Sequence, residues 1–421
     1  MKIQAITGFK DILPSETPLW RYIENEAREI FHSFGFREIR LPLLEKTELF
    51  ARSIGEATDI VEKEMYTFAD KGQTLRPEAT ASLLRAFIEH GLHVRRPVQK
   101  LYTMGPMFRH ERPQKGRLRQ FHQMDVEVIG AVEPQVDAEL MAMGGLLLER
   151  LGITASLEIN SLGCPVCRPE YKSRLVAFLR ERGERLCADC RRRTVTNPLR
   201  VLDCKKSSCK AELEGAPSIL DTLCPGCRDH FSRVRRFLDL LGIGYRINTF
   251  MVRGLDYYTR TTFEFIADGL GAQSAVGAGG RYDGLIEQLG GPRLAGIGFA
   301  LGIERLVLLM EDAQPDAAAG QGMDLFVAAL GEEAVLLGTT LVHGLRRRRH
   351  AAAMDYSNRS LKAQMKLAAK LGARYVLIIG ENELKEQRAI LRNMASREQA
   401  SLALDGDAEQ LVTQLIAAVT G

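Results

Sequence analysis

The sequence predicts an α+β fold, in which a domain built on an antiparallel sheet carries an inserted domain and is followed by a small α/β domain. Three observations lead to this prediction. Strand-like segments follow one another in series in the first part of the chain, all eight cysteines lie between residues 164 and 227, and strands alternate with helices after residue 322. Strands in series favour antiparallel pairing, whereas alternation with helices favours a mostly parallel sheet.

The first part of the chain predicts one amphipathic helix and two strands. Thr17-Pro18 has the form of a helix start, because proline is tolerated at the first helical position. Apolar residues then recur at helical spacing up to Gly35: Ile23, Ala27, Ile30, Phe31 and Phe34. "FREIRLPLLE" predicts a strand broken by Pro42, "KLYTMGPMFR" predicts another, and residues 136–151 predict a helix.

The elements that follow the cysteines continue this pattern and then change it. Residues 231–241 predict a helix, "TFEFIA" a strand, and "AGIGFALGIERLVLLM" a strand running into a helix. Residues 312–322 have the composition of a linker, rich in Ala, Gly, Gln and Pro. Beyond them "DLFVAAL", "HAAAMDY" and "YVLIIG" predict short strands separated by two helices. The predicted domains are therefore a main domain of residues 1–163 and 241–312, an insertion of 164–240, a linker of 313–322 and a C-terminal domain of 323–421.

Composition limits the class of protein. A chain of 421 residues is too long for one ordinary core, and its hydrophobic fraction of 45% and charged fraction of 26% are typical of soluble globular proteins. The sequence has neither a run of about 18 apolar residues, as a membrane span requires, nor the apolar core of a signal peptide. We therefore expect a cytoplasmic protein with no membrane partner. The net charge of +4 permits a polyanionic partner without requiring one.

The inserted segment is both basic and rich in cysteine. Between residues 180 and 210, ten basic residues against four acidic ones give a local charge of +6, which exceeds that of the whole chain. The cysteines form four closely spaced pairs: Cys164 and Cys167, Cys187 and Cys190, Cys204 and Cys209, Cys224 and Cys227. In an intracellular protein such pairs fit zinc ligation better than disulfides, because two thiolates supply half of a tetrahedral site. Reduced structural thiols and a redox pair remain alternatives, and the spacing does not tell which pairs share a metal.

A second basic stretch, "FRHERPQKGRLRQFHQ", lies in the first part of the chain. It holds Arg109, Arg112, Lys115, Arg117 and Arg119, with Glu111 as its only acid. The sequence contains no G-x-x-x-x-G-K-[S/T], and "GAGGRYDG" lacks the third glycine of G-x-G-x-x-G. If phosphate is bound, arginine side chains must therefore bind it, since their planar fork suits phosphate oxygens.

The end of this stretch runs into an alternating strand, "FHQMDVEVIG". Phe121, Gln123, Asp125 and Glu127 point to one face and Met124, Val126 and Val128 to the other. We expect the apolar face to pack and the polar face to look into a cavity, where the ring of Phe121 offers a stacking surface for a base. An ordinary sheet with one solvated side is the alternative.

These residues resemble one family along nearly the whole chain. "FRHERPQKGRLRQFHQ" resembles motif 2 of the class II aminoacyl-tRNA synthetases in the form found in histidyl-tRNA synthetases. The other matching segments are "GFKDILP" at 8–14, "TLRPEAT" at 74–80, "MVRGLDYYTRTTFEF" at 251–265, "GAGGRYDGL" at 277–285, "GFALGIERL" at 298–306, resembling motif 3, and "DYSNRSLKAQMKLAAKLGARYVLIIGENEL". The last resembles the family's anticodon-binding domain.

The resemblance implies a fold and a reaction. The fold would be the class II antiparallel sheet flanked by helices, in a homodimer. The reaction would join L-histidine to ATP, giving histidyl-adenylate and pyrophosphate, and then pass the histidyl group to the 3′ end of tRNA(His). ATP is then a substrate, and Mg²⁺ is expected on the pyrophosphate side.

The resemblance also implies roles for single residues in the catalytic and ATP sites. Arg109 and Arg253 are the implied catalytic residues at the α-phosphate and the histidine carboxylate, because the attack builds negative charge there. Arg305 would hold the distal phosphates, Phe121 would stack on adenine, and Glu111 is a candidate Mg²⁺ ligand. A surface arginine at the start of a helix is the alternative for Arg305.

The amino acid site follows in the same way. Glu78 and Thr80 would take the histidine ammonium, Gln123 the backbone end, and Glu127 with Tyr258 the imidazole, with Tyr257 close by. Hydrogen bonds to both ring nitrogens would reject apolar isosteres by roughly 10⁴–10⁵. The two tyrosines as plain core aromatics are the alternative.

The charged loop from Arg112 to Arg119 is expected to contact the acceptor stem. Arg112 and Gln114 resemble the positions that read the extra 5′ guanosine of tRNA(His), and Lys115 to Arg119 are expected to form a flexible, solvated loop before RNA binds. The cysteines depart from the family, which does not generally need metal in this insertion.

Two rival functions remain open at the level of sequence. A non-catalytic paralogue, the histidine-sensing regulatory subunit of ATP phosphoribosyltransferase, would share the fold but lack the phosphate-binding arginines and the C-terminal domain. A zinc-ribbon nucleic-acid-binding protein would account for the cysteines but not for the Arg253 motif.

Overall fold

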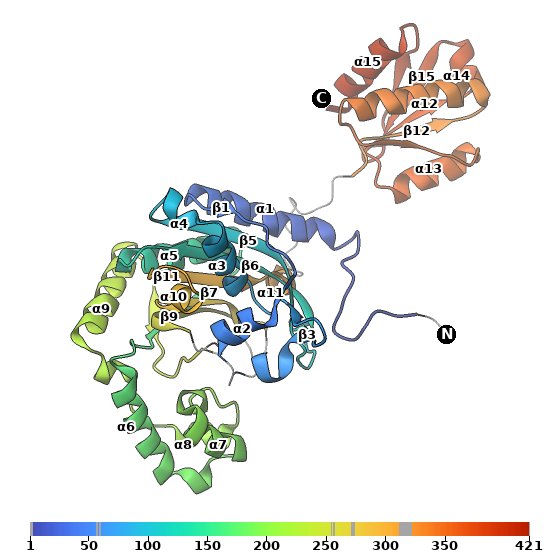
Figure 1. Ribbon diagram of the computed structural model, residues 1–421. Coiled ribbons are helices and arrows are strands. Elements are labelled where there is room, and N and C mark those ends of the chain that lie inside the picture. The colour runs from blue at the N-terminus through green and yellow to red at the C-terminus, as the bar shows by residue number, and fades with distance from the viewer. Residues whose placement is uncertain are drawn as a thin grey trace. The chain divides into compact units, whose positions relative to one another are not determined.

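A computed structural model of the chain is shown in Figure 1. It describes residues 3–55, 58, 60–253, 255, 257–270, 274–310 and 322–420. The chain divides into two compact units, Met1–Ala318 and Ala319–Gly421. Of the predicted linker, 313–322, all but Gly322 lies outside the described residues, as do Gly254 and Asp256 of the "MVRGLDYYTRTTFEF" segment.

The first unit is organised around an eight-stranded sheet with the order β1-β5-β6-β11-β10-β9-β7-β8. Its strands are β1 (Arg37–Glu38), β5 (Gln99–Phe108), β6 (Gln120–Ile129), β7 (Ala155–Ser161), β8 (Tyr245–Ile247), β9 (Thr259–Ala267), β10 (Ala275–Arg281) and β11 (Gly296–Gly302). The six central strands pair antiparallel, and only the edge strands β1 and β8 pair parallel with their neighbours. The predicted antiparallel sheet is therefore confirmed.

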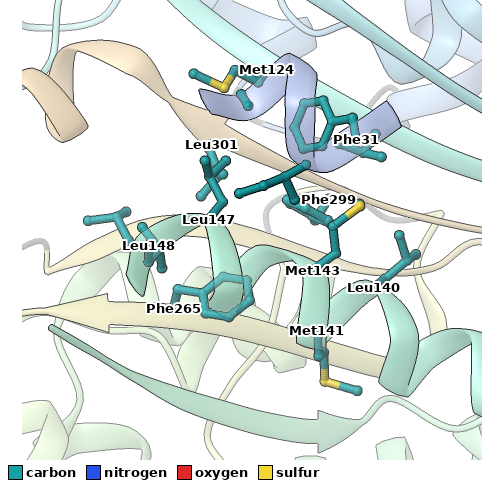
Figure 2. Close-up of a cluster of buried hydrophobic side chains, with 14 of the residues drawn as sticks. Phe31, Met124, Leu140, Met141, Met143, Leu147, Leu148, Phe265, Phe299 and Leu301 are labelled. Carbon is teal, nitrogen blue, oxygen red and sulfur yellow. The ribbon is translucent and has the colours of Figure 1, made fainter. Parts of the chain in front are cut away.

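One face of this sheet is covered by helices and holds the main apolar core. The helices are α1 (Thr17–Ser33), α5 (Pro134–Arg150), α9 (Pro225–Leu240) and α11 (Ile303–Met310). Figure 2 shows Leu140, Met143 and Leu147 of α5 packed against Phe265 and Phe299 of the sheet. Met124, Val126 and Val128 of β6 are fully buried in this core, as the alternation of the strand predicts.

The first unit also contains a second, smaller sheet and several short helices. A three-stranded sheet with the order β2-β4-β3 consists of β2 (Leu44–Lys46), β4 (Gln73–Leu75) and β3 (Tyr66–Phe68). Short helices accompany it: α2 (Thr47–Ile54), α3 (Thr80–Glu89), α4 (Leu92–Arg95) and α10 (Leu285–Gln288). "FREIRLPLLE" was predicted as one interrupted strand, but its two halves belong to different sheets, β1 and β2, because the chain turns away at Pro42.

The cysteine-rich segment is helical. It contains α6 (Arg168–Glu181), α7 (Ala188–Thr196) and α8 (Ser207–Glu212) with several short helical turns, and it ends in α9. Figure 1 shows α6, α7 and α8 on the side away from α1, whereas α9 lies beside α5. Only Cys227 of α9 belongs to the small core of the inserted segment, since Phe231, Val234 and Leu238 pack into the main core.

A buried polar network also ties α9 to the main domain. Arg281 of β10 forms an ion pair with Asp137 of α5 at 2.8 Å, and both side chains are fully buried. His230 Nε2 of α9 lies 3.1 Å from the same carboxylate. Arg281 also donates to the carbonyls of Ala131 and Glu133, so the charge is hydrogen-bonded on several sides.

The second unit is a small α/β domain. Its sheet has the order β13-β12-β14-β15-β16, with β12 (Leu325–Ala329), β13 (Ala352–Met354), β14 (Tyr375–Ile379), β15 (Arg388–Asn393) and β16 (Gln399–Ala403). The helices are α12 (Glu332–Arg347), α13 (Leu361–Lys370), α14 (Glu381–Lys385) and α15 (Ala408–Thr420). The three predicted strands, β12, β13 and β14, are parallel. β15 and β16 add an antiparallel hairpin, so the prediction of a mostly parallel sheet was wrong for these two strands. No helix among the described residues of either unit meets the length and apolarity that crossing a bilayer requires.

Candidate active site

A cavity of about 600 Å³ lies on the polar face of β6. Phe121, Gln123, Asp125 and Glu127 all line it, as the alternation of "FHQMDVEVIG" predicts. At the inner end of the cavity the polar face of β6 is shielded from solvent, because Asp125 and Glu127 are each only 2% exposed. Gly298 of β11 pairs with Glu127, and a Cβ there would come within 1.7 Å of Glu127 Oε2, so the carboxylate occupies the space that a side chain would fill.

The inner end of the cavity is an acidic cage. Glu127 Oε1 accepts a hydrogen bond from Thr80 Oγ1 at 2.7 Å, and Glu127 Oε2 accepts one from the Tyr282 hydroxyl at 2.6 Å. Glu78 accepts from the backbone N–H groups of Thr80 at 2.8 Å and Ala81 at 2.9 Å, at the start of α3.

These carboxyl groups hold their protons unusually firmly. Burial, strengthened by the charge of Glu78, raises the pKa of Asp125 to about 8. Burial likewise raises the pKa of Glu127 to about 8, against the hydrogen bonds from Tyr282 and Thr80. The pKa of Glu78 is raised by the same desolvation. Three carboxyl groups that lack enough positive charge around them suit a cationic ligand.

Three tyrosines form one wall of the acidic end. The rings of Tyr257 and Tyr258 have centroids 4.7 Å apart, and Tyr282 meets Tyr257 edge to face at 6.0 Å. All three side chains are nearly buried, and burial raises the pKa of each phenol. The hydroxyls therefore stay protonated and can donate. Tyr282 had no predicted role, although it belongs to the "GAGGRYDGL" segment.

The outer end of the cavity is lined by arginines. Arg109 donates from Nε to the Pro77 carbonyl at 2.8 Å, and its guanidinium lies 5.3 Å from the centre of the Phe121 ring. Arg305, at the start of α11, donates to the carbonyls of Gly116 and Ala275. Burial and the neighbouring charge of Arg117 lower the pKa of Arg305. An anion here would relieve the repulsion among the cations.

Arg253 lies among the residues that line the cavity. Its NH1 pairs with Glu264 Oε1 at 2.7 Å, and its guanidinium lies 5.0 Å from the centre of the Tyr258 ring. Within the described part of the chain, Arg253 Nε, Gln123 Oε1 and Asp125 Oδ2 are buried without a hydrogen-bond partner. All three residues line the cavity, so these atoms are placed to bind a ligand.

The charged loop between β5 and β6 is closed by backbone hydrogen bonds. The Arg109 N–H donates to the Arg119 carbonyl at 2.9 Å, and Gln114 and Arg117 form a two-way backbone bridge around Gly116, whose φ is +72°. Arg117 pairs with Glu111 at 3.1 Å. Lys115 is exposed, but Arg117 and Arg119 are half-buried, so the expectation of a solvated segment from Lys115 to Arg119 was wrong for these two arginines.

The N-terminal segment holds Arg119 in place through backbone hydrogen bonds. The N–H groups of Arg119 and Gln120 donate to the Gly8 carbonyl, and a Cβ at Gly8 would lie 2.7 Å from Arg119. Arg112 and Gln114 remain exposed on the hairpin, where a partner can reach them.

The cysteines form two sets of four, and the structure supplies the pairing that the spacing did not. Cys164 and Cys167 lie with Cys224 and Cys227, whereas Cys187 and Cys190 lie with Cys204 and Cys209. Within each set all sulfur atoms lie within 4.8 Å of one another, and none of the eight is in a disulfide.

The inserted segment also contributes to the cavity wall, which the sequence did not suggest. Arg200, Asp203 and Lys205 line the cavity from the stretch between α7 and α8. Arg200 NH1 lies 3.5 Å from the Arg253 carbonyl.

Comparisons with known proteins agree on one family. A histidyl-tRNA synthetase family model matches residues 8–165 and 180–306, and an anticodon-binding domain model matches residues 324–414. The chain is 62% identical to the histidine–tRNA ligase of Desulfotalea psychrophila, over 96% of this chain and 94% of that protein. It is 56% identical to that of Geobacter sulfurreducens, over 96% and 97% of the two chains.

A solved structure agrees over the full length. The apo histidyl-tRNA synthetase of S. aureus superimposes with a TM-score of 0.81 at 39% identity, covering 98% of this chain and all of the other. The family models, the relatives and this structure agree, and the chain therefore belongs to the histidyl-tRNA synthetase family.

Proposed function

We propose that this chain is a histidine–tRNA ligase that works in two steps in the cavity over β6. In the first, a carboxylate oxygen of L-histidine attacks the α-phosphorus of ATP, and the bond to the β-phosphate breaks to release pyrophosphate. In the second, a ribose hydroxyl at the 3′ end of tRNA(His) loses its proton, attacks the histidyl carbonyl and displaces AMP. The observation that carries the proposal is a single cavity with an acidic cage at one end, arginines at the other, and Arg253 in its wall.

The acidic cage is the proposed histidine site. Glu78, Thr80 and Gln123 take the ammonium and backbone end, and the buried Asp125 adds negative charge beside them. Glu127 and Tyr258 face the imidazole, with Tyr257 and Tyr282 completing the wall. Because Glu127 is held by Thr80 and Tyr282, the carboxylate is fixed before histidine arrives, which favours selective binding.

The arginine end is the proposed ATP site. Arg109 and Arg253 face the α-phosphate and the histidine carboxylate, where charge builds in the transition state, and Arg305 takes the distal phosphates. Phe121 stacks on adenine. The support for this arrangement is the orphaned Nε of Arg253 and the pKa of Arg305, which burial and then the charge of Arg117 lower.

The metal ions proposed are Mg²⁺ at the pyrophosphate and Zn²⁺ in the inserted segment. Mg²⁺ usually keeps several waters and uses one or two carboxylates together with substrate phosphates. Glu111 fits this mode, because its carboxylate lines the cavity near Arg117 and Arg305. When bound, Mg²⁺ neutralises charge on the leaving pyrophosphate.

The proposed partners beyond the substrates are tRNA(His) and a second copy of the chain. Arg112 and Gln114 are exposed on the hairpin and suit the acceptor end of the RNA. The second unit takes the anticodon, as its family model suggests. A homodimer and a cytoplasmic location are what the family and the use of tRNA lead us to expect.

The rival functions are not favoured. A regulatory paralogue would not need the arginines that line the cavity or a matched anticodon-binding domain. A plain zinc-ribbon protein would not need the acidic cage.

Histidine-dependent exchange of pyrophosphate into ATP tests the first step. We expect exchange with histidine and Mg²⁺ and none with the other amino acids. Well-folded protein without exchange would refute the proposal, and exchange without charging of tRNA(His) would limit it to the first step.

A further inference from the structure

We propose that the inserted segment binds two zinc ions, each through four cysteine thiolates, and that one of them positions the backbone of Arg253 in the catalytic cavity. The proximal site consists of Cys164, Cys167, Cys224 and Cys227, and the distal site of Cys187, Cys190, Cys204 and Cys209. The positioning part rests on the proposed function, whereas zinc binding does not.

The sulfur geometry of both sites fits a tetrahedral metal. In the proximal site Cys164 Sγ lies 3.6 Å from Cys167 Sγ and 3.9 Å from Cys224 Sγ. Four sulfurs at about 2.3 Å from zinc in a tetrahedron lie about 3.8 Å from one another. These separations are too long for a disulfide bond of about 2.05 Å, and they match the edges of a four-thiolate site.

Backbone groups support a charged sulfur in each site. The Cys224 N–H points at Cys167 Sγ at 3.1 Å, and the Cys187 N–H points at Cys209 Sγ at 3.2 Å. N–H groups aimed at sulfur stabilise the thiolates that a metal requires. Zinc binding to four thiols would release their protons, so the charge that is buried is shared with the metal.

The inserted segment has little else to hold it together. Its core is a small cluster that includes Tyr171, Leu175 and Leu179 of α6, and five of the fourteen buried residues are cysteines: Cys167, Cys190, Cys204, Cys209 and Cys227. A core of this size rarely folds without a metal or disulfides, and the disulfides are absent. Reduced thiols alone would leave eight weakly bonding sulfurs in the place of two cross-links.

The distal site connects directly to the cavity. The chain between Cys190 and Cys204 includes the helical turn Pro198–Val201, whose Val201 is buried in the cysteine core. The adjacent Arg200 points the other way, lines the cavity and approaches the Arg253 carbonyl. Val252 packs against the same cysteine core. The distal metal therefore fixes the surface on which residues 252 and 253 rest.

Metal analysis tests the two sites. Full-length protein purified without chelator should contain two zinc ions per chain, and Cys204→Ser should lose one while keeping the other. In the native protein the cysteine thiols should be unreactive while zinc is bound. Their reaction with an organomercurial should be accompanied by release of the zinc. Folded protein that contains no zinc and whose cysteines all react freely would overturn the assignment.

Pyrophosphate exchange tests the positioning. Arg200→Ala leaves every cysteine in place, and we expect it to lower kcat for exchange about tenfold while KM for histidine changes little, since a small displacement of a catalytic group is costly. Arg200→Lys should restore part of the rate. Arg191→Ala, an exposed arginine on α7 of the same segment, is the matched control and should leave both constants unchanged.

The outcomes separate the parts of the proposal. Normal exchange by Arg200→Ala, or by zinc-depleted Cys204→Ser protein, would overturn positioning while the metal content still decides zinc binding. Absence of exchange by the unaltered protein would instead refute the proposed function. A fall in exchange accompanied by an equal fall for Arg191→Ala would mean that only the general charge of the segment matters.

Discussion

Each end of the cavity brings together groups of one charge sign, carboxyl groups at the inner end and arginines at the outer end. At the inner end Glu78, Asp125 and Glu127 are buried, and desolvation raises the pKa of each, while the charges of neighbouring carboxylates raise the pKa of Asp125 and of Glu127 further. At the outer end burial and the charge of Arg117 lower the pKa of Arg305. Neither end is electrostatically satisfied by the protein alone.

The difference teaches that the cavity suits a ligand that is cationic at one end and anionic at the other. In the proposed function, an ammonium neutralises the acidic end and phosphates neutralise the basic end. Arg253 is paired with Glu264 and still has an unbonded Nε, so it can serve a group that forms between them. The largest expected effects therefore come from Arg253, and smaller ones from either end.

Replacing Arg253 should have the largest effect on the reaction. Arg253→Ala should lower the rate of histidine activation by roughly 10²–10³, because it removes one donor to the charge of the transition state. Pyrophosphate exchange measures the rate, and Arg253→Lys, which keeps the charge but not the fork, should recover only part of it. An unchanged rate would place the catalytic cation elsewhere in the cavity.

Removing the charge of Glu127 should break the acidic end alone. Glu127→Gln keeps the shape, and kcat/KM for histidine should fall about 10- to 100-fold, as expected for a hydrogen bond to a charged group of about 1.5–3 kcal/mol. Tyr282→Phe removes only the supporting hydroxyl and should cost less. If KM for ATP rises instead of KM for histidine, the two ends have been assigned the wrong way round.

Removing a cation from the outer end should affect ATP alone. Arg305→Ala should raise KM for ATP about tenfold, which corresponds to about 1.4 kcal/mol, with KM for histidine unchanged. Arg293→Ala, at an exposed position, is the matched control. Equal changes in both substrates would argue against separate ends.

The smallest predicted effect is a dependence of histidine binding on pH. Asp125 and Glu127, each with a pKa of about 8, are largely protonated in the empty protein at pH 7, and the ammonium favours their charged form. Histidine should therefore release protons on binding, and its affinity should rise with pH until about pH 8, by less than tenfold per pH unit for each carboxyl group that ionises. Calorimetry at pH 7 in buffers of different ionisation enthalpy measures this release.

The control for this experiment is Glu127→Gln, since free histidine titrates in the same way with both proteins. The variant should release fewer protons. Proton uptake by the unaltered protein would contradict the raised pKa values. The same shifts lower stability as pH rises from about 4 toward 8, because over this range the unfolded state ionises its carboxyl groups while the folded state still holds the protons of Asp125 and Glu127.

The sequence predicted the part of the site that lies on one strand. The alternation of β6 placed Phe121, Gln123, Asp125 and Glu127 on one face because the side-chain period of a strand is two. Tyr282 and Glu264 could not be placed in this way, since they reach the cavity only through the order of β9, β10 and β11 in the sheet. The roles of single residues came from family resemblance and stay predictions.

Long-range contacts account for what else the sequence did not predict. Partners within a cysteine set can be sixty residues apart or more, as for Cys164 and Cys224, so spacing alone could not pair them. Arg200 lines the cavity although it belongs to the inserted segment and not to the sheet. The hairpin of β15 and β16 was missed because β16 is mostly exposed and β15 buries only two apolar side chains, Ala389 and Leu391.

The contact of His230 with Asp137 and Arg281 bears on how the inserted module can be exchanged between proteins. The family model leaves residues 166–179 unmatched. The three buried groups, His230, Asp137 and Arg281, all lie outside the stretch between Gly163 and Cys224. Removing α9 as well would leave a buried ion pair without its third member and expose the apolar side of α5. A chimaera should therefore keep α9, and because Cys227 of α9 belongs to the proximal cysteine set, the exchanged module must supply the other three cysteines of that set.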